Sequence, residues 1–465
     1  MRTLYFIGIC GTGMATLAAI LKHKGFDVRG SDQHVYPPMS TFLEGEGIGI
    51  LQGFNDSHIT SDIDLVVIGN ALSRGNPEVE VVLDRKIRYC SMPEAIREFC
   101  LWGARSIVVT GTHGKTTTAA LAGWLLTRAG LDPSVLVGGV IAKLGPRDSS
   151  YRLGGGRDFV IEGDEYDSAF FDKTAKFLKY LPDIAVVGNI EFDHADIYPD
   201  LASIRLAFRR FVNLVPRNGL LVLGADSEDA LALRESAHAA VETFGLGDAD
   251  WRAYDIVATP GGTRFRARSR GESLGVFDVP LAGVHNVKNA LAAMAVATRV
   301  GVDTETLRCA MREFGGVRRR LEIVGSAGGV TIYDDFAHHP TAVRETLAAV
   351  RAAHPAARIW AVFEPRSASS CRRVFQEAFA ASFDAADEVV IAGVFRSNVP
   401  ADERLSPDGL VTALRSRGKR ARYVPAVGEI VSLVARESRQ GDLIVAMSNG
   451  GFEEIHRKLL EALGR

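Results

Sequence analysis

Short apolar runs, each followed by a polar or Gly-rich turn and then a helix-like stretch, recur along most of the chain. Three stretches open in this way, with strands expected at residues 4–7, 106–110 and 330–333. Further runs continue the alternation at residues 27–30, 65–69, 159–162, 184–188, 220–223, 359–364, 388–392 and 442–447. Apolar runs interleaved with helices are typical of parallel sheets buried on both faces. The pattern predicts an α/β protein.

Residues 249–279 break this alternation, because Gly261 and Gly262 lie between two β-like runs. We expect a small antiparallel excursion there. The chain has 465 residues, whereas single hydrophobic cores stop growing near roughly 250–300 residues. The sequence therefore predicts three α/β domains, at residues 1–103, 104–316 and 317–465.

Composition narrows the class of protein. Hydrophobic residues make up 47% and charged residues 24% of the chain, and the formal net charge is -2. Without a basic tail, nucleic acid is not expected as a partner. No apolar stretch reaches the roughly 18–20 residues that span a bilayer, so no membrane association is expected. The five cysteines are scattered without a CxxC pair, which argues against disulfides and thiolate zinc and favours a cytoplasmic location.

The strongest local signal is the string TGTHGKTTT at residues 110–118, between an expected strand and an alanine-rich helix. A triphosphate needs closely spaced N–H donors, a lysine and a helix N-terminus. The spacing is two residues shorter than the general GxxxxGK[ST] loop. The alternative is a Gly-rich turn with a solvated lysine. The candidate ATP-binding residues in this string are Gly111, Thr112, His113, Gly114, Lys115, Thr116 and Thr117.

A second Gly-rich turn follows the first strand. It could hold a diphosphate at a helix N-terminus, with an acid at the end of the next strand reaching a ribose or uracil group. Taken alone, this turn could equally bind a dinucleotide or be purely structural. Its candidate residues are Gly8, Cys10, Gly11, Thr12, Gly13, Met14 and Asp32.

The string at residues 110–118 resembles the ATP-binding loop of the Mur ligases, and four other segments agree with that family. They are NIEFDHAD at 189–196, GVHNVKNAL at 283–291, GVRRRL at 316–321 and DDFAHHP at 334–340, in family order. The resemblance implies an ATP-dependent ligase that joins a carboxylate to an amine through an acyl phosphate. It also implies a Rossmann-like N-terminal domain for a UDP-sugar, a P-loop ATPase-type central domain and a Rossmann-like C-terminal domain.

The resemblance assigns Mg²⁺ to Glu162, His194 and Thr116, and catalytic charge to Lys115 and Arg320. Three further acids nearby are either additional site residues or solvated loop charges: Asp164, Glu165 and Asp167. Many members of the family bridge two metals with a carbamylated lysine, but here that position falls around Phe208. A lysine-bridged second metal is therefore not expected.

The nucleotide is expected to meet residues from both later domains. By resemblance, His285 and Asn289 contact the adenine side. Helix capping is the alternative for Asn286 and Asn289, and it could be the whole role of Asn286. Arg320 and Asp335 would close onto the nucleotide once substrates are bound. A structural ion pair between Arg320 and Glu322 is the competing interpretation.

The segments EPRS at 364–367 and MSNGGF at 447–452 resemble a branch of the family that acts in peptidoglycan recycling. That branch adds the murein tripeptide L-alanyl-γ-D-glutamyl-meso-diaminopimelate to UDP-N-acetylmuramate. Arg366 can bind a carboxylate bidentately, and Ser448 and Asn449 are further peptide-binding candidates. Alternatively, Asn449 is only a turn residue. His338 or His339 is a hypothesis for the base.

Three rival functions remain open at this point. The first is ligation of free L-alanine to UDP-N-acetylmuramate, and the second is a nucleotide-sugar binding or sensor protein. The third is a related ligase such as a folylpolyglutamate synthetase, which has no need of the turn at residues 8–14. We expect a monomer or a weak homo-oligomer.

Overall fold

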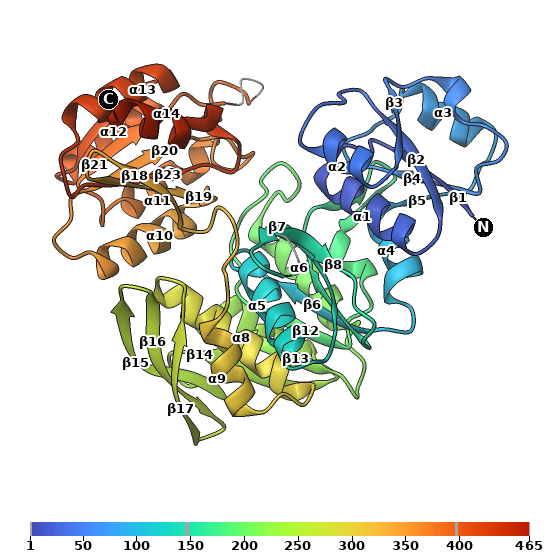
Figure 1. The fold of residues 1–465 in the computed structure, drawn as a ribbon, viewed down its shortest axis with the longest axis horizontal. Coiled ribbons are helices and arrows are strands. Elements are labelled where there is room, and N and C mark those ends of the chain that lie inside the picture. The colour runs from blue at the N-terminus through green and yellow to red at the C-terminus, as the bar shows by residue number, and fades with distance from the viewer. Residues whose placement is uncertain (1, 145–147, 396–398, 465) are drawn as a thin grey trace. The chain divides into compact units, whose positions relative to one another are not determined.

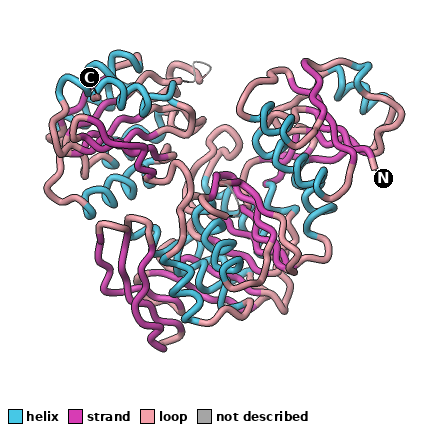
Figure 2. Tube along the Cα trace, in the orientation of Figure 1, coloured by secondary structure: helices cyan, strands magenta, loops and turns pink. Residues whose placement is uncertain are grey.

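The computed structural model describes residues 2–144, 148–395 and 399–464. It confirms the predicted α/β class, with three large sheets flanked by helices and one two-stranded hairpin among the described residues (Figures 1 and 2). By contacts the chain forms two compact units. The first comprises Met1–Ile190, Ala202–Phe244 and Ala292–Asp303, and the second comprises Glu191–Leu201, Gly245–Leu291 and Thr304–Arg465. Within the described residues, no helix is long and apolar enough to cross a membrane.

The N-terminal sheet is parallel, with strand order β3-β2-β1-β4-β5. Its strands are β1 Thr3–Ile7, β2 Asp27–Asp32, β3 Gly49–Gln52, β4 Leu65–Ile68 and β5 Tyr89–Ser91, and its helices are α1 Thr12–His23, α2 Met39–Gly45, α3 Pro77–Asp84 and α4 Met92–Ile96. The central strands β1 and β4 are almost entirely buried apolar residues, as expected where helices cover both faces. The carboxyl ends of β1 and β2 meet, because Ile7 pairs with Ser31.

Seven of the ten strands of the central sheet follow the order β14-β13-β12-β6-β9-β7-β8, and these seven are parallel except for β8. Its strands are β6 Arg105–Thr110, β7 Ser134–Ile141, β8 Ser149–Arg152, β9 Asp158–Glu162, β12 Ile184–Val187, β13 Leu220–Gly224 and β14 Ala240–Gly245. The small hairpin pairs β10 Asp167–Ala169 with β11 Asp172–Ala175, and the helices are α5 Lys115–Arg128, α6 Leu201–Val212, α7 Glu228–Leu231 and α8 Val284–Arg299. The carboxyl ends of β6, β9 and β12 lie at one edge of this sheet.

The antiparallel excursion predicted for residues 249–279 is confirmed. It consists of β15 Trp251–Thr259, β16 Gly262–Ser269 and β17 Glu272–Val279, paired as a meander. Gly262, at the start of β16, has a φ of 143°. Helix α9, Thr304–Arg312, packs on β17.

The C-terminal sheet has the order β18-β19-β23-β20-β21-β22 and is parallel except for β18. Its strands are β18 Glu322–Ala327, β19 Val330–Asp335, β20 Ile359–Phe363, β21 Glu388–Ile391, β22 Arg420–Tyr423 and β23 Leu443–Met447. Its helices are α10 Pro340–Ala353, α11 Gln376–Ser382, α12 Pro407–Ser416, α13 Val427–Glu437 and α14 Ile455–Leu463. The sequence pattern missed β18, because its residues are only half-buried and lack an apolar run.

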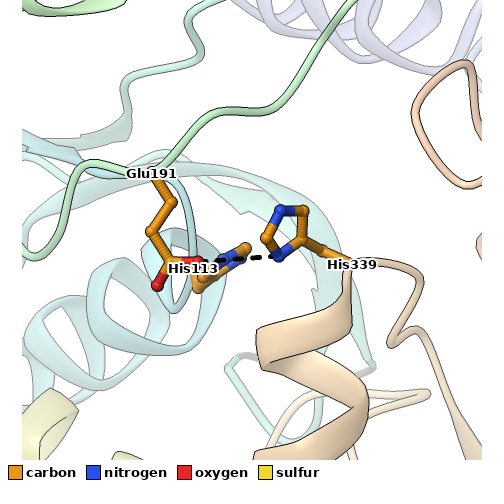
Figure 3. Close-up of side chains that lie close together, drawn as sticks. All are labelled: His113, Glu191 and His339. Atoms are coloured by element: carbon orange, nitrogen blue, oxygen red, sulfur yellow. Dashed lines mark ion pairs between the residues drawn. The ribbon is translucent and has the colours of Figure 1, made fainter. Parts of the chain in front are cut away.

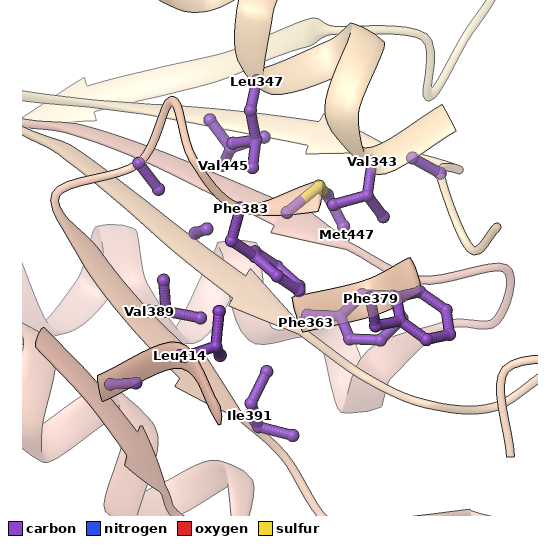
Figure 4. Packing of buried hydrophobic residues seen from close by; sticks show 14 of the residues in the cluster. Val343, Leu347, Phe363, Phe379, Phe383, Val389, Ile391, Leu414, Val445 and Met447 are labelled. Carbon is purple, nitrogen blue, oxygen red and sulfur yellow. The ribbon is translucent and has the colours of Figure 1, made fainter. Parts of the chain in front are cut away.

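Two hydrophobic layers cover the faces of this sheet. One layer holds residues of α10, α11 and α12, and the other holds residues of α13 and α14. In the first layer the ring of Phe363 lies 5.0 Å from that of Phe379 and 5.8 Å from that of Phe383, measured between centroids (Figure 4). Phe363 ends β20, so this packing fixes the place where the chain enters the EPRS segment.

We expect Phe383→Ala to lower the free energy of unfolding by about 3–5 kcal/mol, because it removes a fully buried ring and leaves a cavity. Hydrogen exchange of β20 and β21 in the full chain, read by mass spectrometry across a denaturant series, measures the change. Val374→Ala is the matched control, since Val374 is 65% exposed and should shift stability by less than about 0.5 kcal/mol. Equal protection in both variants would contradict this assignment of the core.

Candidate active site

The Gly-rich turn between β6 and α5 has the geometry of a phosphate-binding loop. Gly111 and Gly114 have φ values of 129° and 79°, which residues with a side chain rarely adopt. An added Cβ at Gly111 would lie 3.0 Å from the backbone nitrogen of Asn189. The amides of Thr112 and His113 donate to the main-chain and side-chain oxygens of Asn189 at 2.9 and 2.8 Å. Asn189 therefore shapes the turn.

Helix α5 begins at Lys115, directly after the left-handed Gly114. The first N–H groups of a helix have no acceptor within it, and they carry the positive end of the helix dipole. Because the amides of Thr112 and His113 donate to Asn189, an anion at this turn would face the amides at the start of α5, from Lys115 to Thr117.

The ammonium group of Lys115 is paired with a carboxylate from the loop after β9. Its Nζ lies 2.7 and 2.9 Å from the two carboxylate oxygens of Glu165, whose side chain is 3% exposed. Burial by itself lowers the pKa of Lys115, but the carboxylates of Glu165, Asp164 and Glu162 outweigh it and the net pKa is raised. Lys115 therefore remains charged at neutral pH.

Two predicted metal ligands lie side by side at this edge of the sheet. The hydroxyl of Thr116 donates to Oε1 of Glu162 at 2.8 Å, and the amide of Gly138 donates to Oε2 at 2.7 Å. A Cβ added at Gly138 would lie 3.1 Å from Oε2, so the glycine lets β7 approach this carboxylate. Hydroxyl and carboxylate oxygens are the ligands that Mg²⁺ prefers, and the residues present fit that ion.

The third predicted ligand, His194, lies in a turn that packs with the C-terminal domain. Its amide donates to Oδ1 of Asp193 at 2.7 Å and to Oγ of Ser369 at 2.9 Å. Burial by itself raises the pKa of Asp193, but His194, His338, His339 and a hydrogen bond from Ser369 outweigh it and hold that pKa well below its usual range. Asp193 is therefore ionised.

Further contacts anchor the same segment, Glu191–Leu201. Figure 3 shows the carboxylate of Glu191 facing His339, whose Nδ1 lies 3.7 Å from Oε2. That oxygen also accepts a hydrogen bond of 2.6 Å from the hydroxyl of Thr341, and the ring of Phe192 stacks on Phe375 at 5.7 Å. The predicted metal ligands are thus divided between the two compact units, with Thr116 and Glu162 in one and His194 in the other.

The two adjacent histidines after β19 differ in their hydrogen bonds. Nδ1 of His339 accepts from the amide of Thr341 at 3.3 Å, which caps α10, and its Nε2 lies 3.1 Å from the carbonyl of Phe192. Nδ1 of His338 lies 2.9 Å from the carbonyl of Phe336, so the proton resides on that nitrogen. Burial lowers the pKa of His338 and keeps its ring neutral.

The residues predicted for the adenine side lie at the start of α8. The side-chain amide of Asn286 donates to the carbonyl of Ala282 at 2.8 Å, and its oxygen accepts from Asn289 at 3.1 Å. These two hydrogen bonds hold the side chains of Asn286 and Asn289 at the start of the helix. Nδ1 of His285 lies 4.0 Å from a carboxylate oxygen of Glu345 on α10.

Arg320 and Asp335 lie where the C-terminal sheet begins. The guanidinium of Arg320 lies 5.0 Å over the ring of Phe336, whereas Glu322 bonds to Arg318 and to the amide of Arg319.

Asp335 accepts from the amides of Leu321 and Ala337 at 2.7 and 2.8 Å and from the hydroxyl of Thr346 at 3.2 Å. Burial raises its pKa, with Arg320 acting in the opposite sense. Asp335 therefore has a structural role, because its hydrogen bonds order the segments at Leu321 and at Ala337.

The peptide-binding candidates converge after β20 and β23. Arg366 follows the end of β20, and Ser448 follows β23 and donates to Oε2 of Glu364 at 2.5 Å. The amide of Gly450 donates back to the Ser448 hydroxyl at 2.9 Å. The structure thus brings Arg366, Ser448 and Asn449 together at the carboxyl edge of this sheet.

The turn after β1 is held by the end of β2. The amides of Gly8 and Ile9 donate to the carbonyl of Ser31 at 2.8 and 3.0 Å, and the amide of Cys10 donates to Oδ2 of Asp32 at 2.9 Å. Gly8 has a φ of 81°. Asp32 therefore shapes the turn, and α1 begins at Thr12 with Gly11 as its N-cap.

Several residues at these sites had no role in the sequence interpretation. Asn189 stood only at the start of a matched string, Gly138 and Ser369 were not considered, and Glu165 was left open between site and solvent. The one available signal for Glu165 was its place among the acids of the loop after β9, next to Asp164 and two residues before Asp167. Phe208, at the position of the family's lysine, is fully buried against Phe177, with ring centroids 5.1 Å apart.

Comparisons with known proteins agree with this geometry. Three family models match the chain: the catalytic domain of the Mur ligase family at residues 3–101, the Mur ligase middle domain at 109–297 and the glutamate ligase domain at 319–450. The UDP-N-acetylmuramate–L-alanyl-γ-D-glutamyl-meso-2,6-diaminoheptandioate ligase of Escherichia coli strain K12 is 40% identical over 99% of this chain and 98% of its own length.

Two solved structures are also similar over their full lengths. The murein peptide ligase of Psychrobacter arcticus is 34% identical with a TM-score of 0.73, covering 100% of this chain and 99% of that one. The UDP-N-acetylmuramate–alanine ligase of Thermotoga maritima is 25% identical with a TM-score of 0.81, covering 99% of each. Sequence identity and TM-score rank these two structures differently. Sequence identity is the better guide to the substrate, because side chains make most of the contacts that select it. The chain belongs to the Mur ligase family of ATP-dependent peptide ligases.

Proposed function

We propose that this enzyme joins the carboxylate of UDP-N-acetylmuramate to the amine of L-alanyl-γ-D-glutamyl-meso-diaminopimelate during peptidoglycan recycling. The observation that carries this proposal is 40% identity over nearly the whole chain to a ligase named for these substrates. A nucleotide-linked sugar and ATP are cytoplasmic metabolites, which supports a cytoplasmic location. UDP-N-acetylmuramate would lie on the turn at residues 8–14.

The reaction has two steps. The lactyl carboxylate takes the γ-phosphoryl group of ATP, which gives an acyl phosphate and ADP. The free α-amine of the peptide's L-alanine then attacks the activated carbonyl, phosphate leaves with the bonding pair, and the ammonium formed loses a proton. Each step redistributes charge on phosphate oxygens, so positioned cations and N–H groups supply most of the catalysis.

The residues of the Gly-rich turn divide this work. Lys115 exchanges the carboxylate of Glu165 for the β/γ-phosphates, while the amides at the start of α5 face the same anion. Thr116 and Glu162, with His194, would hold Mg²⁺, which when bound neutralises charge on the phosphates. Arg320 brings a further positive charge from the C-terminal domain when both substrates are bound.

A rival acceptor is free L-alanine, favoured by the TM-score of 0.81 to the Thermotoga maritima alanine ligase. One residue of the C-terminal domain favours the peptide as acceptor. A peptide with several carboxylates needs cationic partners, and Arg366, which lies beside the turn of Ser448 to Gly450, supplies one.

An acceptor panel tests the proposed function. With UDP-N-acetylmuramate, ATP and Mg²⁺, we expect the diaminopimelate tripeptide to give amide product and stoichiometric ADP, with kcat/KM at least about tenfold above that of free L-alanine, equal to roughly 1.4 kcal/mol. Mass spectrometry identifies the product, and omission of ATP is the control. Preference for L-alanine would establish the rival ligase, and nucleotide-sugar binding without amide product from any amine would establish a sensor.

Lys115→Ala should lower kcat by about 10²- to 10³-fold, because it removes a charge aimed at the transferring phosphoryl group. It also leaves Glu165 buried without its partner, which costs about 3–5 kcal/mol of stability. The double variant Lys115→Ala with Glu165→Gln should recover the unfolding temperature but not the activity. Recovery of ligation in the double variant would show that Lys115 acts only through stability.

Glu162→Gln should raise the Mg²⁺ concentration at half-maximal rate by at least about tenfold, since a neutral amide binds the ion more weakly than a carboxylate does. A Mg²⁺ titration of ADP release measures this shift. The control is Glu272→Gln, an exposed position on β17, which should leave the titration unchanged. An unshifted curve for Glu162→Gln would remove this residue from the metal site.

A further inference from the structure

The guanidinium group of Arg366 lies over an aromatic ring and close to a glycine. Its central carbon lies 3.6 Å from the centroid of the Phe395 ring, which is stacking distance. Gly450 leaves room for the arginine, because a Cβ added at this glycine would lie 2.0 Å from Nε of Arg366. We call these three residues, Phe395, Arg366 and Gly450, the arginine clamp.

The turn that carries Gly450 is itself fixed. Arg319 donates from one nitrogen to the carbonyls of Ser448 and Gly450, both at 2.7 Å, and the hydroxyl of Ser448 joins the amide of Gly450 to the carboxylate of Glu364. The amide of Phe395 donates to the carbonyl of Pro365 at 3.0 Å, which holds the ring near Arg366. The clamp therefore restrains a side chain that ordinarily has large rotamer freedom.

The residue before Gly450 carries a buried acceptor. The side-chain oxygen of Asn449 is buried and has no hydrogen-bond partner within the described part of the chain. A buried polar atom without a partner costs free energy, so a site at this turn favours a ligand with an N–H donor. This part of the domain therefore presents two groups to a ligand, the planar guanidinium of Arg366 and the side-chain oxygen of Asn449.

The charges at the arginine clamp indicate which end of the tripeptide acceptor it would bind. The carboxylate of Glu364 lies 3.5 Å from Arg366, and its side chain is 9% exposed. A cation and an anion side by side complement a zwitterion better than a simple carboxylate. In the tripeptide, only the distal end of diaminopimelate carries a free ammonium and a free carboxylate on one carbon. The attacking L-alanine has no free carboxylate.

Resting on the proposed function, we propose that the arginine clamp and Asn449 form the subsite for the distal amino-acid end of diaminopimelate. Arg366 binds its carboxylate bidentately, and Asn449 accepts a hydrogen bond from its ammonium. Phe395 and Gly450 are positioning residues, because they act on the ligand through the orientation of Arg366. The subsite lies at the far end of the acceptor from the attacking amine, so it governs which peptide is ligated.

The test compares three acceptors in the full-length enzyme: the diaminopimelate tripeptide, the same tripeptide ending in lysine, and the dipeptide L-alanyl-γ-D-glutamate. Phe395→Leu keeps an apolar side chain but removes the aromatic face. We expect its KM for the diaminopimelate tripeptide to rise about 3- to 30-fold, the range that cation–π contacts contribute. We expect kcat to stay within about twofold, and both other acceptors to be unaffected because they lack the distal carboxylate.

Two further variants sharpen the result. Phe395→Tyr should restore the parent KM, since a phenol ring stacks as well as a phenyl ring. Asn449→Leu should raise the same KM about 5- to 100-fold through loss of the acceptor. The matched control is Trp102→Leu, an exposed aromatic outside the C-terminal domain, which should change nothing.

The outcomes separate this subsite from the proposed function. A parent enzyme that ligates no peptide overturns both. A parent enzyme that ligates the tripeptide, with Phe395→Leu raising KM equally for all three acceptors or for none, overturns the subsite alone. A selective rise for the diaminopimelate tripeptide, reversed by Phe395→Tyr, supports it.

Discussion

The buried charge of Lys115 is the constraint on which the nucleotide end of this enzyme depends. A charged ammonium away from water is tolerated only when an opposite charge meets it, and here the loop after β9 supplies Glu165. The next carboxylate, Glu162, bonds to Thr116 from the same helix. The groups that we propose bind ATP thus also hold strand β9 and its following loop against helix α5.

In this site the carboxylate of Glu165 occupies the position beside Lys115 that we propose for the phosphates of ATP. Glu165 presents two oxygens to Lys115, and in the reaction we propose a phosphate takes their place. The amides of Thr112 and His113 donate to Asn189, so we expect the anion to face the start of α5. Pre-formed donors require little reorganisation when charge moves, which is the basis of electrostatic catalysis.

How far the sequence predicted this picture depended on distance along the chain. The turn at 110–118 and the meander at 249–279 are encoded in consecutive residues, and both were predicted correctly. The partners of Lys115 and His113 stand 50 and 76 positions away, and no local pattern connects them. Phe395 over Arg366 was equally hidden, because an aromatic residue in a loop carries no periodicity. Asp335 was matched by its motif, yet its oxygens are largely engaged with Leu321, Ala337 and Thr346.

The chain passes between its two compact units five times, after residues 190, 201, 244, 291 and 303, and one of these passages falls within the continuous helix α8. A swap of the last 149 or so residues between family members would therefore leave behind the segments Glu191–Leu201 and Gly245–Leu291, which pack with that domain. We therefore expect point changes at a turn to alter acceptor specificity in this architecture more readily than exchange of whole domains.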